Sequence, residues 1–233
     1  MKISLPLIVT GLVLSLGSIS QAQESKNIAI SNFTGVSVSN GIDIHLTQSN
    51  NENVKISAHP DLLKNVIVEK EGSNLRVRYK DNVSWSRLFK GQNIKVFINY
   101  KNLRSITASG GSDVTGENEL KTDQLSILSS GGSDIDLAVR TKELKVQSSG
   151  GSDVNLKGTA TSMDLSATGG SDIDALGLLS EYAKVRTSGG SDVNIHVTKA
   201  LDAMASGGSD INYKGNASVK NTSSKSGDVS RIQ

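Results

Sequence analysis

The fold of this chain is decided by a repeated tetrapeptide, Gly-Gly-Ser-Asp, whose third copy lies in the stretch LKVQSSGGSDVNL at residues 144–156. Apolar residues alternate with polar ones before the two glycines, at Leu144 and Val146. The same alternation follows the glycines, at Val154 and Leu156. A period of two is the pattern of a strand that buries one face. The stretch therefore predicts two short strands that meet at a glycine corner.

The tetrapeptide occurs six times along the chain. Its aspartates are 18 to 21 residues apart, at Asp113, Asp134, Asp153, Asp172, Asp192 and Asp210. One such unit cannot bury its apolar face alone, but stacked units share one interior and pair their backbones. We therefore expect an all-β protein, a single-stranded β-helix-like solenoid with coils of about 19 residues.

The repeats divide the chain into regions. Residues 105–213 hold the Gly-Gly-Ser-Asp solenoid, and residues 214–233 form a polar C-terminal tail or a degenerate last coil. Residues 24–104 contain longer alternating runs, and a degenerate corner lies at Asn40-Gly41. We expect this N-terminal β region to start the solenoid and to cap its end, because an uncapped stack leaves an open edge.

The first 22 residues have the features of a secretory signal peptide. Lys2 precedes an apolar run from Ile3 to Ile19, and Ser20-Gln21-Ala22 fits a signal peptidase site. No later run is long enough to span a membrane as a helix, and the chain has no cysteine for disulfides or thiolate sites. The sequence thus predicts an exported protein in the periplasm, on the outer-membrane surface or in the medium.

Charge is distributed unevenly. Residues 64–104 contain ten Lys or Arg against three Asp or Glu, whereas residues 105–233 contain twelve against sixteen. Within the basic part, Trp85 and Phe89 lie close to Arg87 and Lys90, a composition typical of a partner contact. The alternative is that Trp85 and Phe89 fold back as the solenoid cap. Export favours a glycan or an envelope or surface protein as partner, and argues against nucleic acid.

The six repeat aspartates predict a ladder on the surface. In-register stacking would place them in one outward-facing column at intervals of about 4.8 Å. Such a column offers oxygen ligands to Ca²⁺, but the spacing of calcium-binding β-rolls is not met. The alternative is structural, with each carboxylate accepting backbone amides of its own corner. We therefore expect no cofactor, with the Ca²⁺ alternative left open.

Several stretches together resemble a known family. They are the residues from Val36 to Ile44, the element Pro60-Asp61-Leu62-Leu63, the strand from Val96 to Tyr100 with Leu103, and the segment from Ala108 to Val114. On the basis of these stretches, residues 29–213 resemble the family called putative auto-transporter adhesin, head GIN domain. The resemblance implies a right-handed β-helix-like solenoid in an exported envelope protein, and it brings no catalytic residues.

Enzymes that act on polysaccharides provide the main alternative function. Sugar-processing clefts use paired carboxylates and aromatic platforms, yet the repeats contain only Tyr182 and Tyr213 as aromatic residues. The histidines, His45, His59 and His196, are too dispersed to predict a triad or a metal cluster. The sequence therefore predicts a non-catalytic, adhesin-like binding or scaffolding protein of the cell envelope. It does not define the oligomeric state.

Overall fold

The computed structural model describes residues 24–80 and 94–233, which fold as a β-solenoid of about seven turns. Its one helix within these ranges is α1 (Pro60–Leu63). The predicted all-β solenoid with coils of about 19 residues is thereby confirmed. The predicted signal peptide, residues 1–22, and the candidate contact residues Trp85, Arg87, Phe89 and Lys90 lie outside the described ranges.

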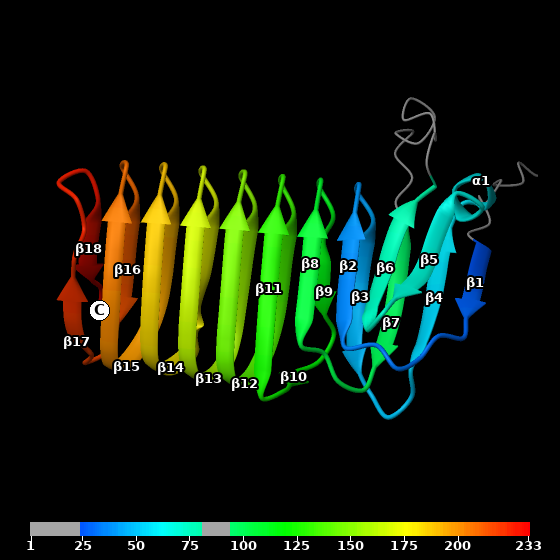
Figure 1. The fold of residues 1–233 in the computed structure, drawn as a ribbon, viewed down its shortest axis with the longest axis horizontal. Coiled ribbons are helices and arrows are strands. Elements are labelled where there is room, and N and C mark those ends of the chain that lie inside the picture. Colours follow the sequence, from blue (N-terminus) through cyan, green and yellow to red (C-terminus); the bar gives the residue numbers. More distant parts are fainter. Residues whose placement is uncertain (1–23, 81–93) are drawn as a thin grey trace, which may run out of the picture.

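The regular part of the stack consists of four long strands. They are β12 (Asp134–Ser149), β13 (Asp153–Thr168), β14 (Asp172–Ser188) and β15 (Asp192–Ser206). Each begins after one glycine corner, bends, and ends at the corner of the next coil, so all corners lie along one edge of the molecule (Figure 1). Neighbouring strands pair in parallel and in register, as Asp134 with Asp153 and Leu144 with Met163.

Shorter strands extend this stack at both ends. Those before it are β8 (Ser105–Ser109), β9 (Val114–Gly116), β10 (Leu120–Lys121) and β11 (Gln124–Ser130). Those after it are β16 (Asp210–Lys214), β17 (Ser218–Asn221) and β18 (Asp228–Arg231). Strands β17 and β18 pair in parallel with β15 and β16, so residues 214–233 add a last, shorter coil.

The first coils are not stacked in sequence order. Strands β2 (Gly35–Ser39) and β3 (Asp43–Gln48) meet at the corner Asn40-Gly41. On one side they pair with β8 and β9, and on the other with β6 (Asn74–Tyr79) and β7 (Lys95–Tyr100). The earliest coil in the sequence therefore lies between two coils that follow it in the chain (Figure 1).

Antiparallel strands cover the N-terminal end of the stack. Strand β5 (Val66–Glu71) pairs with β6, and β4 (Asn53–Ala58) pairs with β7. Strand β1 (Glu24–Ile28) then pairs with β4. These three strands replace the open parallel edge with a short antiparallel one, which limits edge-to-edge association.

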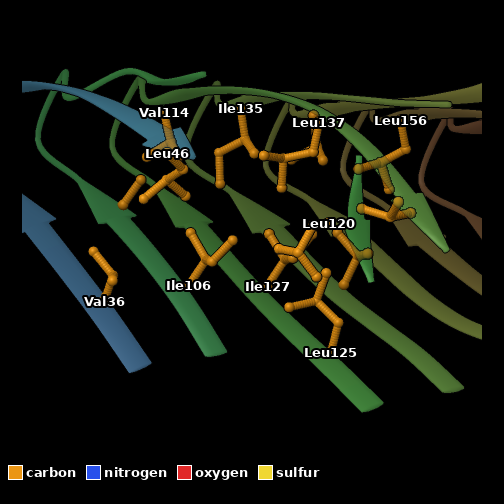
Figure 2. Close-up of a cluster of buried hydrophobic side chains, with 14 of the residues drawn as sticks. Val36, Leu46, Ile106, Val114, Leu120, Leu125, Ile127, Ile135, Leu137 and Leu156 are labelled. Carbon is orange, nitrogen blue, oxygen red and sulfur yellow. The ribbon is translucent and has the colours of Figure 1, made fainter. Parts of the chain in front are cut away.

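The interior is one continuous apolar column. Val36, Ile106 and Ile127 come from successive coils and lie one above the other, opposite Val114 and Ile135 (Figure 2). All five side chains are buried. Burial of these rows is the main stabilising contribution to the stack, because each coil shares its apolar face with both neighbours.

The corners require glycine for two different reasons. Gly150 has φ +71°, and a Cβ there would lie 3.1 Å from the backbone nitrogen of Gly131 in the preceding coil. Gly151 has φ +70°, but a Cβ there would meet only the carbonyl oxygen of Gly170 at 4.0 Å, an ordinary contact. The first glycine therefore permits close stacking as well as the left-handed backbone, whereas the second supplies only the backbone conformation.

Candidate functional site

The aspartate column exists and is longer than the six repeat copies. Asp134, Asp153 and Asp172 are direct register partners, and Asp210 pairs with Asp228 at the C-terminal end. At the other end the column continues through Asp113 to Asp43, which is paired with Lys95. The six repeat aspartates are exposed, as the period-two pattern predicts for residues outside the core.

Two carboxylates of the aspartate column accept hydrogen bonds from backbone N–H groups of the neighbouring coil. The backbone N–H of Asp192 donates to Oδ1 of Asp172 at 3.1 Å, and that of Asp210 donates to Oδ1 of Asp192 at 3.3 Å. At these two levels the donor belongs to the next coil instead of the aspartate's own corner. A carboxylate that accepts such a bond is held against the coil stacked on it.

Sequence reasoning missed the serine that precedes each aspartate. The serines of the six corners, Ser112, Ser133, Ser152, Ser171, Ser191 and Ser209, are all fully buried. The Oγ of Ser152 accepts hydrogen bonds from the backbone nitrogens of Gly132 and Ser133, both at 3.1 Å. Successive side chains of a strand face opposite sides, so an outward Asp153 requires an inward Ser152. This alternation was the only signal in the sequence for the buried serines.

One aspartate of the column has a perturbed titration. Burial raises the pKa of Asp43 above its usual value, and the nearby carboxylate of Asp113 raises it further. His45 and Lys95 act in the opposite direction with smaller effects. The net cost of ionising Asp43 follows from its half-buried position at the start of the column.

The histidines do not gather into a site. His45 stacks on Phe97 with ring centroids 4.9 Å apart, and its Nδ1 lies 2.7 Å from a carboxylate oxygen of Glu117. His59 caps α1, where its Nδ1 accepts from the backbone nitrogen of Asp61. In residues 24–80 and 94–233, no three His, Cys, Asp or Glu side chains are grouped to hold a metal ion. The expectation that the column holds no cofactor stays a prediction, with Ca²⁺ as its alternative.

The structure brings together a second set of residues that the sequence did not reveal. A groove of about 800 Å³ lies where the chain between β7 and β8 meets the bends of the first two repeat coils. We call it the basic groove. Its walls are formed by Thr34, Asn102, Arg104, Lys121, Thr122, Asp123, Gln124, Arg140, Thr141 and Lys142.

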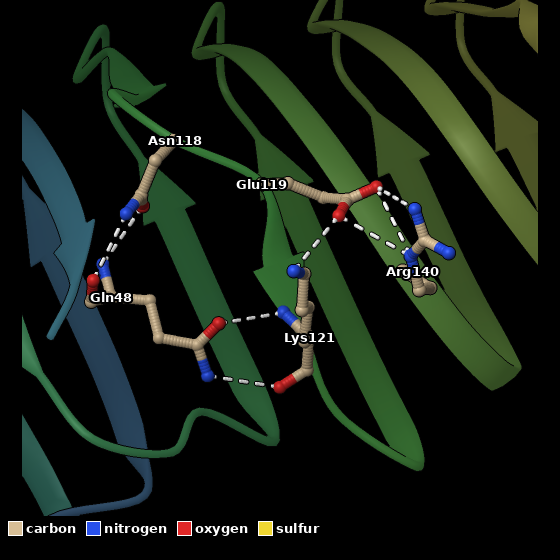
Figure 3. A network of polar contacts seen from close by, with 5 residues as sticks. All are labelled: Gln48, Asn118, Glu119, Lys121 and Arg140. Carbon is tan, nitrogen blue, oxygen red and sulfur yellow. Dashed lines mark hydrogen bonds and ion pairs between the residues drawn. The ribbon is translucent and has the colours of Figure 1, made fainter.

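A carboxylate organises two cations of this groove (Figure 3). The guanidinium of Arg140 donates to Glu119 through Nη2 at 3.1 Å, and Nζ of Lys121 lies 3.5 Å from the same carboxylate. The hydrogen bond from Arg140 lowers the pKa of Glu119, and Lys121 adds to the effect. Glu119 therefore stays ionised and partly neutralises both cations.

An amide side chain fixes the position of Lys121. Oε1 of Gln48 accepts from the backbone nitrogen of Lys121 at 2.8 Å, while its Nε2 donates to the Lys121 carbonyl at 2.9 Å (Figure 3). The backbone of Gln48 is paired in turn with the amide group of Asn118. These bonds attach the short strand β10 to β3, which pairs with the coil of β8 and β9.

Comparison with known proteins identifies the family. Residues 32–217 match the family described as putative auto-transporter adhesin, head GIN domain. The chain belongs to this family. No curated protein matches its sequence. The expected resemblance is thereby confirmed, and the match covers the cap strands β4 and β5 as well as the repeats, whereas β1 precedes it.

Solved structures share the fold over nearly the whole chain. A putative adhesin from Bacteroides fragilis NCTC 9343 is 26% identical with a TM-score of 0.82, and the match covers 91% of this chain and 98% of that one. A putative adhesin from Parabacteroides merdae ATCC 43184 is 23% identical with a TM-score of 0.74, covering 92% and 98%.

A third solved structure has a different description. A putative lipid binding protein from Parabacteroides distasonis ATCC 8503 is 16% identical with a TM-score of 0.73, covering 92% of this chain and 98% of that one. At that identity the likeness shows the fold alone. None of the helices in the described part of this chain has the length and apolar character needed to cross a membrane.

Proposed function

We propose that this protein is an exported, non-catalytic, adhesin-like binding protein of the cell envelope. The observation that carries the proposal is the repetition of polar rows along the stack, one of exposed carboxylates and one of mostly half-buried hydroxyls. A row of hydroxyls, Ser130, Ser149, Thr168, Ser188 and Ser206, follows one side of the glycine corners, and the aspartate column follows the other. Such rows suit an extended partner, a glycan chain or the surface of an envelope protein, that contacts several coils at once.

The uniform setting of the carboxylates supports binding over catalysis. Glycosidases need two carboxylates in unlike environments, so that one is protonated while the other is ionised. The six repeat aspartates are instead exposed in every coil, as expected when one structural unit is repeated along the stack. A polysaccharide-active enzyme is therefore the alternative that the first experiment has to test.

The experiment is a screen of the purified protein against glycans, with both binding and release of reducing ends measured. Binding without release is the expected result, whereas new reducing ends would identify an enzyme. Phospholipid vesicles form a second arm, because one solved structure of the same fold is described as lipid binding. Of the exposed apolar residues, Leu128 has Gln147 and Met204 has Arg186 as register partner, so they form no continuous apolar strip and we expect no vesicle binding. Vesicle binding with no glycan or protein partner would contradict the proposal.

A further inference from the structure

We propose that the basic groove is the site that binds an acidic glycan, a chain of uronic acid units, through its carboxylates. This inference rests on the proposed function and names the class of ligand. Its basis is a groove where cations outnumber carboxylates, built from segments that the fold brings together.

The groove has the dimensions of a site for several sugar units. Beyond its own volume of about 800 Å³, it adjoins a second hollow of about 470 Å³. Arg104 and Gln124 line both hollows, and the second one adds Lys145 together with the carboxylates of Glu143 and Asp164, so the excess of cations lies in the basic groove itself. A single inorganic anion would leave most of this space to water, whereas an oligosaccharide would fill it.

Arg104 is the cation best suited to receive a ligand. It is exposed, and its side chain forms no hydrogen bond or ion pair within the described residues. A guanidinium presents a planar pair of donors that matches a carboxylate in two parallel hydrogen bonds. The position of Arg104 between the two hollows lets it hold a carboxylate at the middle of the ligand.

The other three cations are only partly neutralised. Lys142 pairs with Asp123 at 3.0 Å, and Lys121 and Arg140 share the single carboxylate of Glu119. Four cations thus face two carboxylates, so the groove keeps a positive field that attracts anions. Lys121 and Arg140 are register partners on neighbouring coils, so two positive charges lie side by side, and the next coil places Thr159 at this position.

The lining also indicates how the glycan would be held. None of the residues that form the two hollows is aromatic, so stacking on sugar rings contributes nothing. Binding therefore rests on ion pairs and on hydrogen bonds from polar side chains such as Asn102 and Thr34. Interactions of this kind weaken with ionic strength. The bonds of Gln48 to the Lys121 backbone fix one wall before the ligand arrives, which reduces the entropic cost of binding.

The test is calorimetry of the purified protein with a hexamer of galacturonic acid, and with a neutral glucose hexamer as comparison. We expect binding of the acidic hexamer only, weakened as salt is raised. Arg104→Gln should lower its affinity about tenfold, the loss of one good charge-assisted contact. Lys184→Gln removes an exposed positive charge on β14 outside the groove and should leave the affinity unchanged.

A second pair of variants tests the role of Glu119. Glu119→Gln frees Lys121 and Arg140 and should strengthen binding of the acidic hexamer several-fold. Asp202→Asn gives the same change in net charge on β15, far along the stack, and should have no effect. Circular dichroism of each variant checks that the solenoid is intact.

The outcomes separate this inference from the proposed function. Failure of the acidic hexamer to bind, or equal effects of Arg104→Gln and Lys184→Gln, would overturn the groove as the site. Glycan binding in the screen would still support the binding function in that case. If the protein binds neither glycans nor envelope proteins in any form, the proposed function itself fails.

Discussion

The hydroxyl of Ser152 accepts hydrogen bonds from two backbone amides of the preceding coil, those of Gly132 and Ser133. Ser191 makes the same pair of contacts to Gly170 and Ser171, both at 3.2 Å. A corner of two glycines leaves backbone N–H groups without strand partners, and buried N–H groups must be paired. Ser152 and Ser191 thus satisfy the corner of the preceding coil, whereas Ser171 and Ser209 accept the amide of Thr168 or Ser206 in their own corners.

We expect Ser152→Ala to destabilise the protein by roughly 2 kcal/mol, because two amides of the preceding corner lose their acceptor. Urea unfolding followed by far-UV circular dichroism measures the change. Ser126→Ala, which removes an exposed hydroxyl in β11, is the matched control and should change stability little. Equal stabilities of the two variants would show that water replaces the serine.

Asp43 makes stability depend on pH. Its folded pKa is raised above the ordinary value of 3.8, so the folded state binds the proton more tightly than the unfolded state does. The stabilisation is present below pH 3.8 and is lost as pH rises through the folded pKa. Asp43→Asn cannot ionise, so it should raise the melting temperature at pH 7, with the gain disappearing toward pH 3.

Asp61 is the control for this pH effect. The hydrogen bond and charge of Lys64 lower the pKa of Asp61, so its contribution has the opposite sign and is present above pH 3.8. Asp61→Asn should bring no gain at pH 7. A gain from Asp43→Asn that is equal at pH 3 and pH 7 would contradict the assignment, because it would not come from ionisation.

For the aspartate column we expect no response to Ca²⁺. Each coil supplies one column carboxylate, and Asp136, Asn155 and Asp174 stand in the neighbouring row, so few charged ligands are available for each ion. Calorimetry and thermal melts at millimolar Ca²⁺ should show neither heat nor a shift. A saturable shift that disappears in the double variant Asp153→Asn/Asp172→Asn would instead establish a cation site.

At the scale of elements, the N-terminal end differs from the repeats in the direction of its strands. Parallel coils end at β6 and β7, and the antiparallel strands β5 and β4 pair with them. Strand β4 has partners on both sides, because β1 pairs with its other edge. The cap therefore depends on the backbone of β4 more than on any one side chain.

Lys55→Pro tests the cap. Lys55 is exposed and lies in β4 opposite both Asn27 and Phe97, so proline removes a ladder N–H without removing a core side chain. We expect a lower melting temperature and concentration-dependent association in size-exclusion chromatography, because the edge of β7 opens. Lys55→Ala keeps the N–H and should behave as the unaltered protein. Unchanged elution and melting of Lys55→Pro would show that β4 is dispensable.

Differences in coil length are absorbed at the bends. The pairing of β13 with β14 shifts between Asn155 and Lys157, and that of β14 with β15 shifts between Ala175 and Leu179. Beyond these bulges the register of the corner-facing residues is restored, as in the pairing of Ser188 with Ser206. Bulges thus let coils of unequal length share one straight row of corners.

At the scale of the whole molecule, stability is shared between neighbouring coils, as expected for a stack with contacts mainly between adjacent units. Removing one complete coil should therefore leave the fold intact. Deletion of residues 150–168 joins Ser149 to Gly169, and Ser149 already occupies the register position of Thr168. The shortened stack should lose about 4.8 Å of length, the spacing of one strand.

Small-angle scattering and far-UV circular dichroism measure the result of this deletion. The variant should remain folded and β-rich, with a lower free energy of unfolding because one coil-to-coil interface is lost. Deletion of residues 150–158 alone serves as the control, because it removes a corner and half of a coil and should prevent folding. Equal behaviour of the two deletions would contradict a stack of interchangeable coils.

The coil length, the inward and outward faces and the column of aspartates could all be predicted from the amino-acid sequence. Alternation is a local property, so Val154 and Asp153 must face opposite sides wherever the strand lies. The inward direction of the corner serines follows from the same parity. The composition of the repeats also predicted that their carboxylates recur at every level.

The order of the first coils and the basic groove depend on contacts between distant segments and could not be predicted from the sequence. The N-terminal strands carry no exact repeat, so nothing local specifies that β2 and β3 lie between β6–β7 and β8–β9. That pairing depends on the summed burial of side chains far apart in the sequence. Arg104, Lys121 and Arg140 come together for the same reason, because parallel coils place residues from successive turns side by side.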